Sequence, residues 1–187
     1  MPRLRFETAR DLFDSFALMR EELQLEPTDD RCLDFVRSLA AQGEVAKAVG
    51  ICAYLLPRRE AVWWACHFVR SMTPPRSAEE NNCFAAAEEW VQDPEEGRRL
   101  AALELGTRSD YRSPATLVAR AAGYAGNTLP IGPDVWASVQ PEQTPRAVRG
   151  AILSAVAHLP PEARTDALRR CLDEAVRLAS DQTGASQ

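Results

Sequence analysis

Proline and glycine residues divide this chain into segments of helical length, and this punctuation constrains the fold more than any other feature. Between the breaks, apolar residues recur at three- and four-residue spacing. Leu12, Phe16 and Met19, within a helix predicted over residues 10–24, are one example. Such spacing places apolar side chains on one face of a helix, and strand signals do not recur. We therefore predict an all-α fold of about seven to eight helices in antiparallel hairpins, an irregular HEAT-like helical bundle.

The length of the chain bounds the number of domains. With 187 residues, it is long enough to bury one sizeable core. We predict a single helical domain over residues 1–180. The polar residues 181–187 follow it, and we expect them to form a frayed C-terminal tail.

Charge and cysteine usage limit the partners and the compartment. The formal net charge is −5, whereas a nucleic-acid partner requires clustered positive charge. No apolar run approaches the roughly 18 residues that span a bilayer, and no apolar signal core follows the N-terminus. The five cysteines are odd in number and scattered, as in a reducing compartment. We expect a cytoplasmic protein with no nucleic-acid partner and no membrane insertion.

One long Gly/Pro segment, residues 124–143, departs from the helical pattern. It is interrupted by Gly126, Pro130, Gly132, Pro133 and Pro141. Apolar residues lie between these breaks, among them Ile131, Val135 and Trp136. A loop of this length in a compact domain is often functional. The alternative is a structural strap whose apolar side chains pack on the body of the domain; both interpretations predict irregular structure.

The helix predicted over residues 59–72 contains the pair Trp63-Trp64 and is the most buried of the chain. On a helical wheel, apolar residues cover more than half of its circumference, and Trp64, Cys66 and Val69 lie within that arc. A helix of this kind lies in the centre of a bundle. The remaining arc is polar except for Trp63, which core packing does not explain.

Trp63 has two interpretations. In the structural one, it packs against a neighbouring segment, and Arg59 stacks on its face by cation–π attraction. In the functional one, it is exposed and flanked by Arg59 and Arg70, and these residue types are enriched at interface hot spots. Arg58 and Arg59 also lie at a helix N-terminus, where positive charge is unfavourable, so we predict an acidic partner for them. The candidates are Glu60, the pair Glu95-Glu96 and a partner protein.

Motifs for catalysis are not found. The chain contains no G-x-G-x-x-G, Walker-type, H-E-x-x-H, C-x-x-C or G-x-S-x-G pattern. Cys66 and His67 are adjacent on a helix and point about 100° apart, which is a poor geometry for a thiol–imidazole pair. We therefore predict a protein that is not an enzyme, with no catalytic residue, no cofactor and no metal site.

Two stretches carry a resemblance to known proteins. The first is Leu56-Pro57-Arg58-Arg59-Glu60-Ala61-Val62-Trp63-Trp64-Ala65-Cys66. The second, from Pro114 to Val156, joins an alanine-rich helix, the Gly/Pro segment and a final helix that begins near Thr144-Pro145. Both resemble an uncharacterised family of proteobacterial helical proteins that is associated with type VI secretion gene neighbourhoods. The resemblance implies no activity, and Gly123-Tyr124 departs from an aromatic–tryptophan pair expected there.

The leading functional prediction is a cytoplasmic protein-interaction protein, an adaptor or accessory of a bacterial secretion system, with type VI implied by the resemblance. We expect a protein partner, either a secretion component or an effector, and a homodimer is compatible with the sequence. The predicted binding surface consists of Arg58, Arg59, Trp63, Arg70, Tyr124 and Trp136. One alternative is an immunity protein that neutralises a toxin by binding. An uncharacterised enzyme is the least favoured.

Overall fold

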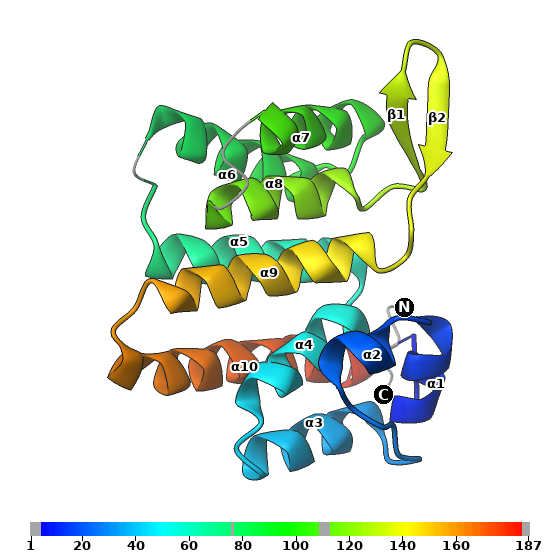
Figure 1. Ribbon diagram of the computed structural model, residues 1–187, viewed down its shortest axis with the longest axis vertical. Helices are drawn as coiled ribbons and strands as arrows, with labels where there is room; N and C mark the ends of the chain where they lie inside the picture. The colour runs from blue at the N-terminus through cyan, green and yellow to red at the C-terminus, as the bar shows by residue number, and fades with distance from the viewer. Residues whose placement is uncertain (1–4, 76, 109–112, 185–187) are drawn as a thin grey trace. The chain divides into compact units, whose positions relative to one another are not determined.

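A computed structural model describes residues 5–75, 77–108 and 113–184 (Figure 1). Ten helices and one two-stranded sheet lie in these ranges. The predicted all-α fold is therefore confirmed, with more helices than the seven to eight expected. None of the described helices combines the length and the apolar content needed to cross a bilayer.

The chain divides into two compact units. Unit 1 comprises Met1–Pro57 and Leu159–Gln187, and unit 2 comprises Arg58–His158. Pro57, between the helices Val45–Leu55 and Arg58–Met72, is the last residue of unit 1 before the chain enters unit 2. The single domain predicted over residues 1–180 stays a prediction, and residues 185–187 of the predicted tail lie outside the described residues.

The described part of unit 1 contains α1 (Ala9–Ser15), α2 (Met19–Leu23), α3 (Cys32–Ala41), α4 (Val45–Leu55) and α10 (Pro161–Gly184). α4 is buried along nearly its whole length and packs against α3 and α10. The single helix predicted over residues 10–24 is wrong, because α1 and α2 are separate. The chain bends at Phe16, whose backbone is extended and whose buried ring packs edge-on against Tyr54, with 5.0 Å between ring centroids.

The described part of unit 2 contains α5 (Arg58–Met72), α6 (Ala78–Gln92), α7 (Glu96–Arg108), α8 (Pro114–Gly123) and α9 (Gln143–Ala157). Each helix packs against the next, and α5 also packs against α8 and α9 (Figure 1). Trp64, Cys66 and Val69 are buried, as the helical wheel predicted. α5 is therefore the central helix of this unit, and its buried arc fixes which residues remain at its surface.

The segment predicted as an irregular loop contains a β-hairpin, so that prediction is wrong. β1 (Thr128–Gly132) pairs antiparallel with β2 (Val135–Ser138). The two strands are joined by Pro133 and Asp134, and Asp134 adopts a left-handed φ of 57°, a conformation that aspartate tolerates. A β-bulge between Pro130 and Gly132 shifts the register of the two strands near the turn. Apolar residues on both sides of a short Gly/Pro/Asp turn were the missed hairpin signal.

Candidate functional site

A groove with a volume of about 440 Å³ lies between α5 and α6. One wall consists of α5 residues at helical spacing, so that they share a face: Trp63, Cys66, His67, Arg70 and Ser71. The other wall consists of Glu88, Val91 and Gln92 from α6. On the helical wheel, Trp63, His67 and Arg70 lie outside the apolar arc of α5. The structure places these residues in the groove.

Trp63 stands at the rim of the groove. Its side chain is 41% exposed, and its indole lies flat on the imidazole of His67, with 5.5 Å between centroids and 7° between ring planes. The two residues are one helical turn apart, which brings their side chains together. The predicted stacking of Arg59 on Trp63 is wrong, because His67 provides the stacking partner. Trp63 is thus both packed and accessible.

The charges in the groove are paired with each other. Arg70 donates from Nε and Nη2 to the two carboxylate oxygens of Glu88, at 2.9 and 3.1 Å. This bidentate geometry is the strongest arrangement of an arginine and a carboxylate. The Arg70 guanidinium also lies 4.9 Å from the ring centroid of the buried Phe84. The groove therefore presents aromatic and aliphatic surface and no unpaired formal charge from these two residues.

Cys66 does not offer a reactive thiol. The side chain is buried, and burial, followed by the nearby Glu88 carboxylate, raises the pKa of this thiol well above its ordinary value. A thiol that stays protonated is a poor nucleophile and a poor metal ligand. Among the described residues, no group of three histidine, cysteine or acidic side chains is placed to hold a metal ion.

Arg59 bonds to the backbone carbonyls of two residues of the α6 wall. Its Nε donates to the Val91 carbonyl at 2.6 Å and its Nη2 to the Gln92 carbonyl at 3.2 Å. The last carbonyls of a helix lack intrahelical donors and carry the negative end of the helix dipole. They therefore suit a cation at the start of the neighbouring antiparallel helix. In the described part of the chain, Arg59 therefore bonds to these carbonyls and not to Glu60 or the pair Glu95-Glu96; an acidic group of a partner protein stays a prediction.

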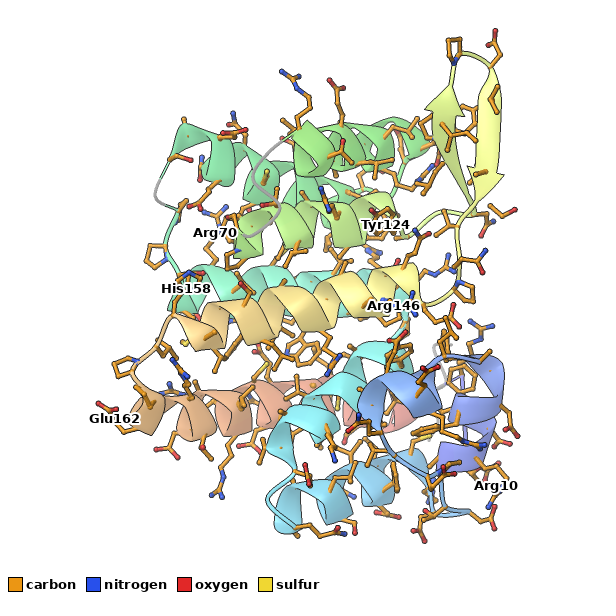
Figure 2. The ribbon with its side chains drawn as sticks, in the orientation of Figure 1. Arg10, Arg70, Tyr124, Arg146, His158 and Glu162 are labelled. Carbon is orange, nitrogen blue, oxygen red and sulfur yellow. The ribbon has the colours of Figure 1, made fainter. Side chains whose placement is uncertain are left out.

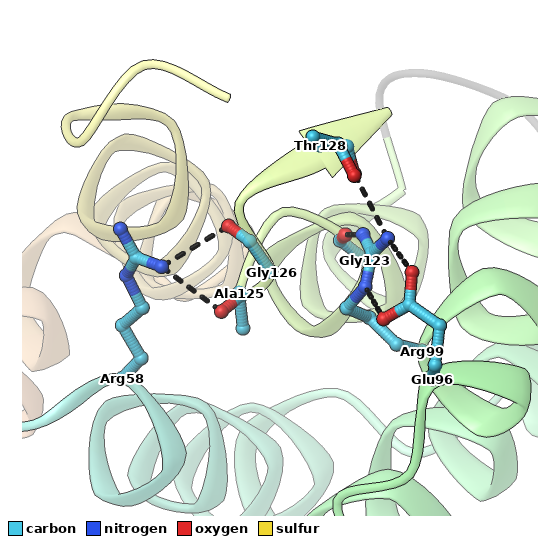
Figure 3. Close-up of polar contacts among 7 residues, drawn as sticks. All are labelled: Arg58, Glu96, Arg99, Gly123, Ala125, Gly126 and Thr128. Atoms are coloured by element: carbon cyan, nitrogen blue, oxygen red, sulfur yellow. Dashed lines mark hydrogen bonds and ion pairs between the residues drawn. The ribbon is translucent and has the colours of Figure 1, made fainter. Parts of the chain in front are cut away.

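Arg58 holds a different helix end in the same way. Its Nη1 donates to the carbonyls of Ala125 at 3.0 Å and Gly126 at 3.1 Å, just beyond α8 (Figure 3). These carbonyls belong to the segment that leads into β1. The start of α5 thus fixes both the end of α6 and the base of the hairpin.

Arg99 is the residue of this region that sequence reasoning missed. It is only 2% exposed, and Figure 3 shows its guanidinium between Glu96 and the carbonyls of Gly123 and Thr128. The bond to the Thr128 carbonyl is 2.8 Å and that to Glu96 Oε2 is 2.7 Å. Hydrogen bonding from Arg99 lowers the pKa of the Glu96 carboxyl. Arg99 and Arg58 hold the base of the hairpin from two sides.

The six predicted binding residues do not meet at one point. Trp63 and Arg70 line the groove, and Arg59 bonds to its α6 wall. Tyr124 is half-buried, and Figure 2 shows it at the opposite end of unit 2 from Arg70. Trp136 lies on β2 and is 51% exposed. A role in partner binding stays a prediction for all six.

The structure is that of a helical protein with an aromatic groove between α5 and α6. More particularly, the chain belongs to the family of unknown function DUF6931, whose model matches residues 35–179. The predicted membership of an uncharacterised family is thereby confirmed. The match includes the groove and the hairpin. No curated protein and no solved structure matches the chain.

Proposed function

We propose that this protein is a protein-interaction protein whose groove between α5 and α6 binds an apolar side chain of a protein partner. The observation that carries the proposal is the half-exposed Trp63, stacked on His67 at the rim of the groove. A rigid, partly exposed indole gives a large contact area and loses little side-chain entropy on binding.

The nature of the groove favours an apolar ligand group. Arg70 and Glu88 neutralise each other, so a charged ligand would have to break a bidentate pair in order to bind either one. Val91 and the indole of Trp63 offer apolar contact, while Ser71 and Gln92 offer polar groups at the same walls. A volume of about 440 Å³ lies within the range of binding pockets. An aromatic or branched aliphatic side chain from an exposed partner segment meets these conditions.

The biological setting that we propose is a bacterial secretion system, in which the protein acts in the cytoplasm as an adaptor or accessory component. Type VI secretion is proposed on the resemblance carried by the Leu56–Cys66 signature. An acidic chain with net charge −5 also suits a partner with basic surface around the apolar contact. The partner would be a structural component of the apparatus or one of its effectors.

The test is affinity purification of the full chain from its native host, followed by binding measurements with the purified partner. Trp63→Ala is expected to lower the affinity at least about tenfold, as for a hot-spot aromatic residue. Leu18→Ala is the matched control, because Leu18 is a large apolar residue of unit 1 with 43% exposure. It should leave affinity unchanged, and both variants should keep the wild-type far-UV circular dichroism.

Equal affinity of Trp63→Ala and wild type for the purified partner would exclude the groove as the binding site. Arg59 is unsuitable for this test, because its substitution would free two carbonyls at the end of α6. A partner that is a toxin, and whose toxicity is relieved by co-expression of this chain, would favour the immunity alternative over the adaptor.

A further inference from the structure

The hairpin is an apolar, nearly uncharged surface on an acidic protein. Ile131, Val135 and Trp136 are 65%, 51% and 51% exposed, and they are three of the five large apolar side chains exposed in the described part of the chain. Residues 127–140 include one charged residue, Asp134, whereas 26% of the whole chain is charged. β1 and β2 project beyond the helices of unit 2 (Figure 1). The strap interpretation, in which these side chains pack on the body, does not describe this arrangement.

The ladder geometry shows which backbone groups of the hairpin face outward. The Val139 N–H donates to the Asn127 carbonyl at 2.8 Å, and hydrogen-bonded pairs alternate with non-bonded pairs in an antiparallel ladder. Given the observed register, Leu129 and Ala137 form the next hydrogen-bonded pair. The pairs Thr128–Ser138 and Pro130–Trp136 are then non-bonded pairs. The backbone groups of these four residues therefore point away from the neighbouring strand of the hairpin.

The outer edge of β1 is closed to further pairing. Its outward residues are Thr128 and Pro130. The Thr128 carbonyl already accepts a hydrogen bond from Arg99, and Pro130 has no N–H to donate. Proline at an edge is a common device against strand addition. A further strand cannot form a regular ladder on this side.

The outer edge of β2 is open. Its outward residues are Trp136 and Ser138, and both retain an N–H and a carbonyl. Among the described residues, no hydrogen bond outside the hairpin reaches either backbone. An edge with free donors and acceptors beside exposed apolar side chains is a template for strand addition.

We propose that β2 pairs with β2 of a second copy of this chain, antiparallel, about a two-fold axis at Ala137. In this register, Trp136 of each copy lies opposite Ser138 of the other copy. The two symmetric pairs bond all outward N–H and carbonyl groups of these residues. It also places Val135 opposite Val139, an apolar pair. The residue on the axis is alanine, which is small enough for the close approach of a non-hydrogen-bonded pair.

The self-complementary register and its closure argue for a second copy rather than another partner. Two copies of a chain with net charge −5 repel each other, so a stable contact between them has to use a neutral surface, and the hairpin supplies one. Because the β1 edge is closed, pairing through β2 uses the one open edge of each copy and stops at a dimer. A two-fold contact of this kind is the commonest form of protein self-association.

The first test measures the dimer by sedimentation velocity of the full chain over a concentration series. Wild type is expected to show a reversible monomer–dimer equilibrium. Ser138→Pro removes one hydrogen bond per copy at the β2 edge and should weaken the dimer roughly tenfold to a hundredfold. Thr128→Pro is the matched control, because it places the same residue on the closed β1 edge, and its dimer should match wild type. A monomer at every concentration, or equal weakening by both prolines, would overturn the proposal.

The second test measures disulfide cross-linking at the proposed two-fold axis, and it does not depend on the folding of a proline variant. The five native cysteines are all buried, whereas Ala137 is half-buried, so Ala137→Cys introduces a thiol that is more accessible than the native ones. Cα atoms in a non-hydrogen-bonded antiparallel pair lie about 4.5 Å apart, within the range of a disulfide. Mild oxidation should therefore link Ala137→Cys into dimers, whereas Thr128→Cys should stay monomeric. Failure of Ala137→Cys to cross-link, or equal cross-linking of both variants, would contradict the two-fold axis.

Discussion

The indole of Trp63 lies parallel to the imidazole of His67, with 5.5 Å between centroids and 7° between planes, whereas the adjacent Trp64 is fully buried. Consecutive residues of a helix point about 100° apart, so one tryptophan faces the core of unit 2 and the other faces the groove. The pair Trp63-Trp64 thus divides into a residue buried in the core and a residue whose indole is accessible in the groove.

The two tryptophans are expected to differ sharply in their contribution to stability. Trp64→Ala should lower the free energy of unfolding by about 3–5 kcal/mol, because it leaves a cavity in the core. Trp63→Ala should lower it by about 1–2 kcal/mol, because its indole is partly exposed and the substitution removes one stacked pair and part of a buried surface, with no core cavity. Urea denaturation followed by far-UV circular dichroism measures both. A similar loss for the two variants would show that Trp63 is a structural residue.

Arg99 is expected to anchor the hairpin. Arg99→Met leaves the carbonyls of Gly123 and Thr128 without this donor, and we expect a loss of about 2 kcal/mol in the free energy of unfolding. Hydrogen exchange of the backbone amides in residues 127–139 should become faster. Arg98→Met is the matched control, because Arg98 forms an exposed ion pair with Asp93 and a long, exposed 3.3 Å hydrogen bond to the Glu89 carbonyl, together worth no more than about 1 kcal/mol. Unchanged exchange in Arg99→Met would contradict the anchoring role.

The pair of Arg99 and Glu96 also predicts a dependence on pH. Hydrogen bonding from Arg99 lowers the pKa of Glu96 from its ordinary value of 4.5. A carboxyl with a lowered folded-state pKa stabilises the fold above its unfolded-state pKa, and this stabilisation is lost as the pH falls through the folded-state value. Melting temperatures should therefore fall with acidification below about pH 4.5, and more steeply in wild type than in Glu96→Gln. Glu95→Gln, the neighbouring control, should keep the wild-type profile; an unaltered slope in Glu96→Gln would exclude this linkage.

The helical architecture was predictable because its signal is local. Residues at three- and four-residue spacing share a helix face wherever the helix lies, so the burial of Trp64 and Val69 follows from the sequence. The exception at Phe16 is instructive. Its spacing fits a longer helix, but the ring is buried against Tyr54, and a tertiary contact between segments distant in sequence ends the helix earlier.

The polar contacts of the candidate site were not predictable for a different reason. Arg58, Arg59 and Arg99 all donate to backbone carbonyls, and every residue carries a carbonyl, so no sequence pattern marks the acceptor. Arg98 and Arg99 are the same residue type at adjacent positions, and only Arg99 is buried. The difference depends on where the end of α8 and the start of β1 lie in space.

Two glycines of α7 should respond oppositely to the same substitution. A Cβ at position 97 would meet no atom within 4 Å, whereas a Cβ at position 106 would lie 2.8 Å from Arg120 Cγ and 2.9 Å from its backbone nitrogen. Gly97→Ala should therefore raise the free energy of unfolding by about 0.5 kcal/mol, because alanine favours the helix. Gly106→Ala should lower it by about 2 kcal/mol, because α7 and α8 would have to separate, which would lengthen the 2.6 Å hydrogen bond from Arg120 Nε to the Gly106 carbonyl. Denaturant midpoints that shift in opposite directions would support this close approach of α7 and α8, and a common shift would contradict it.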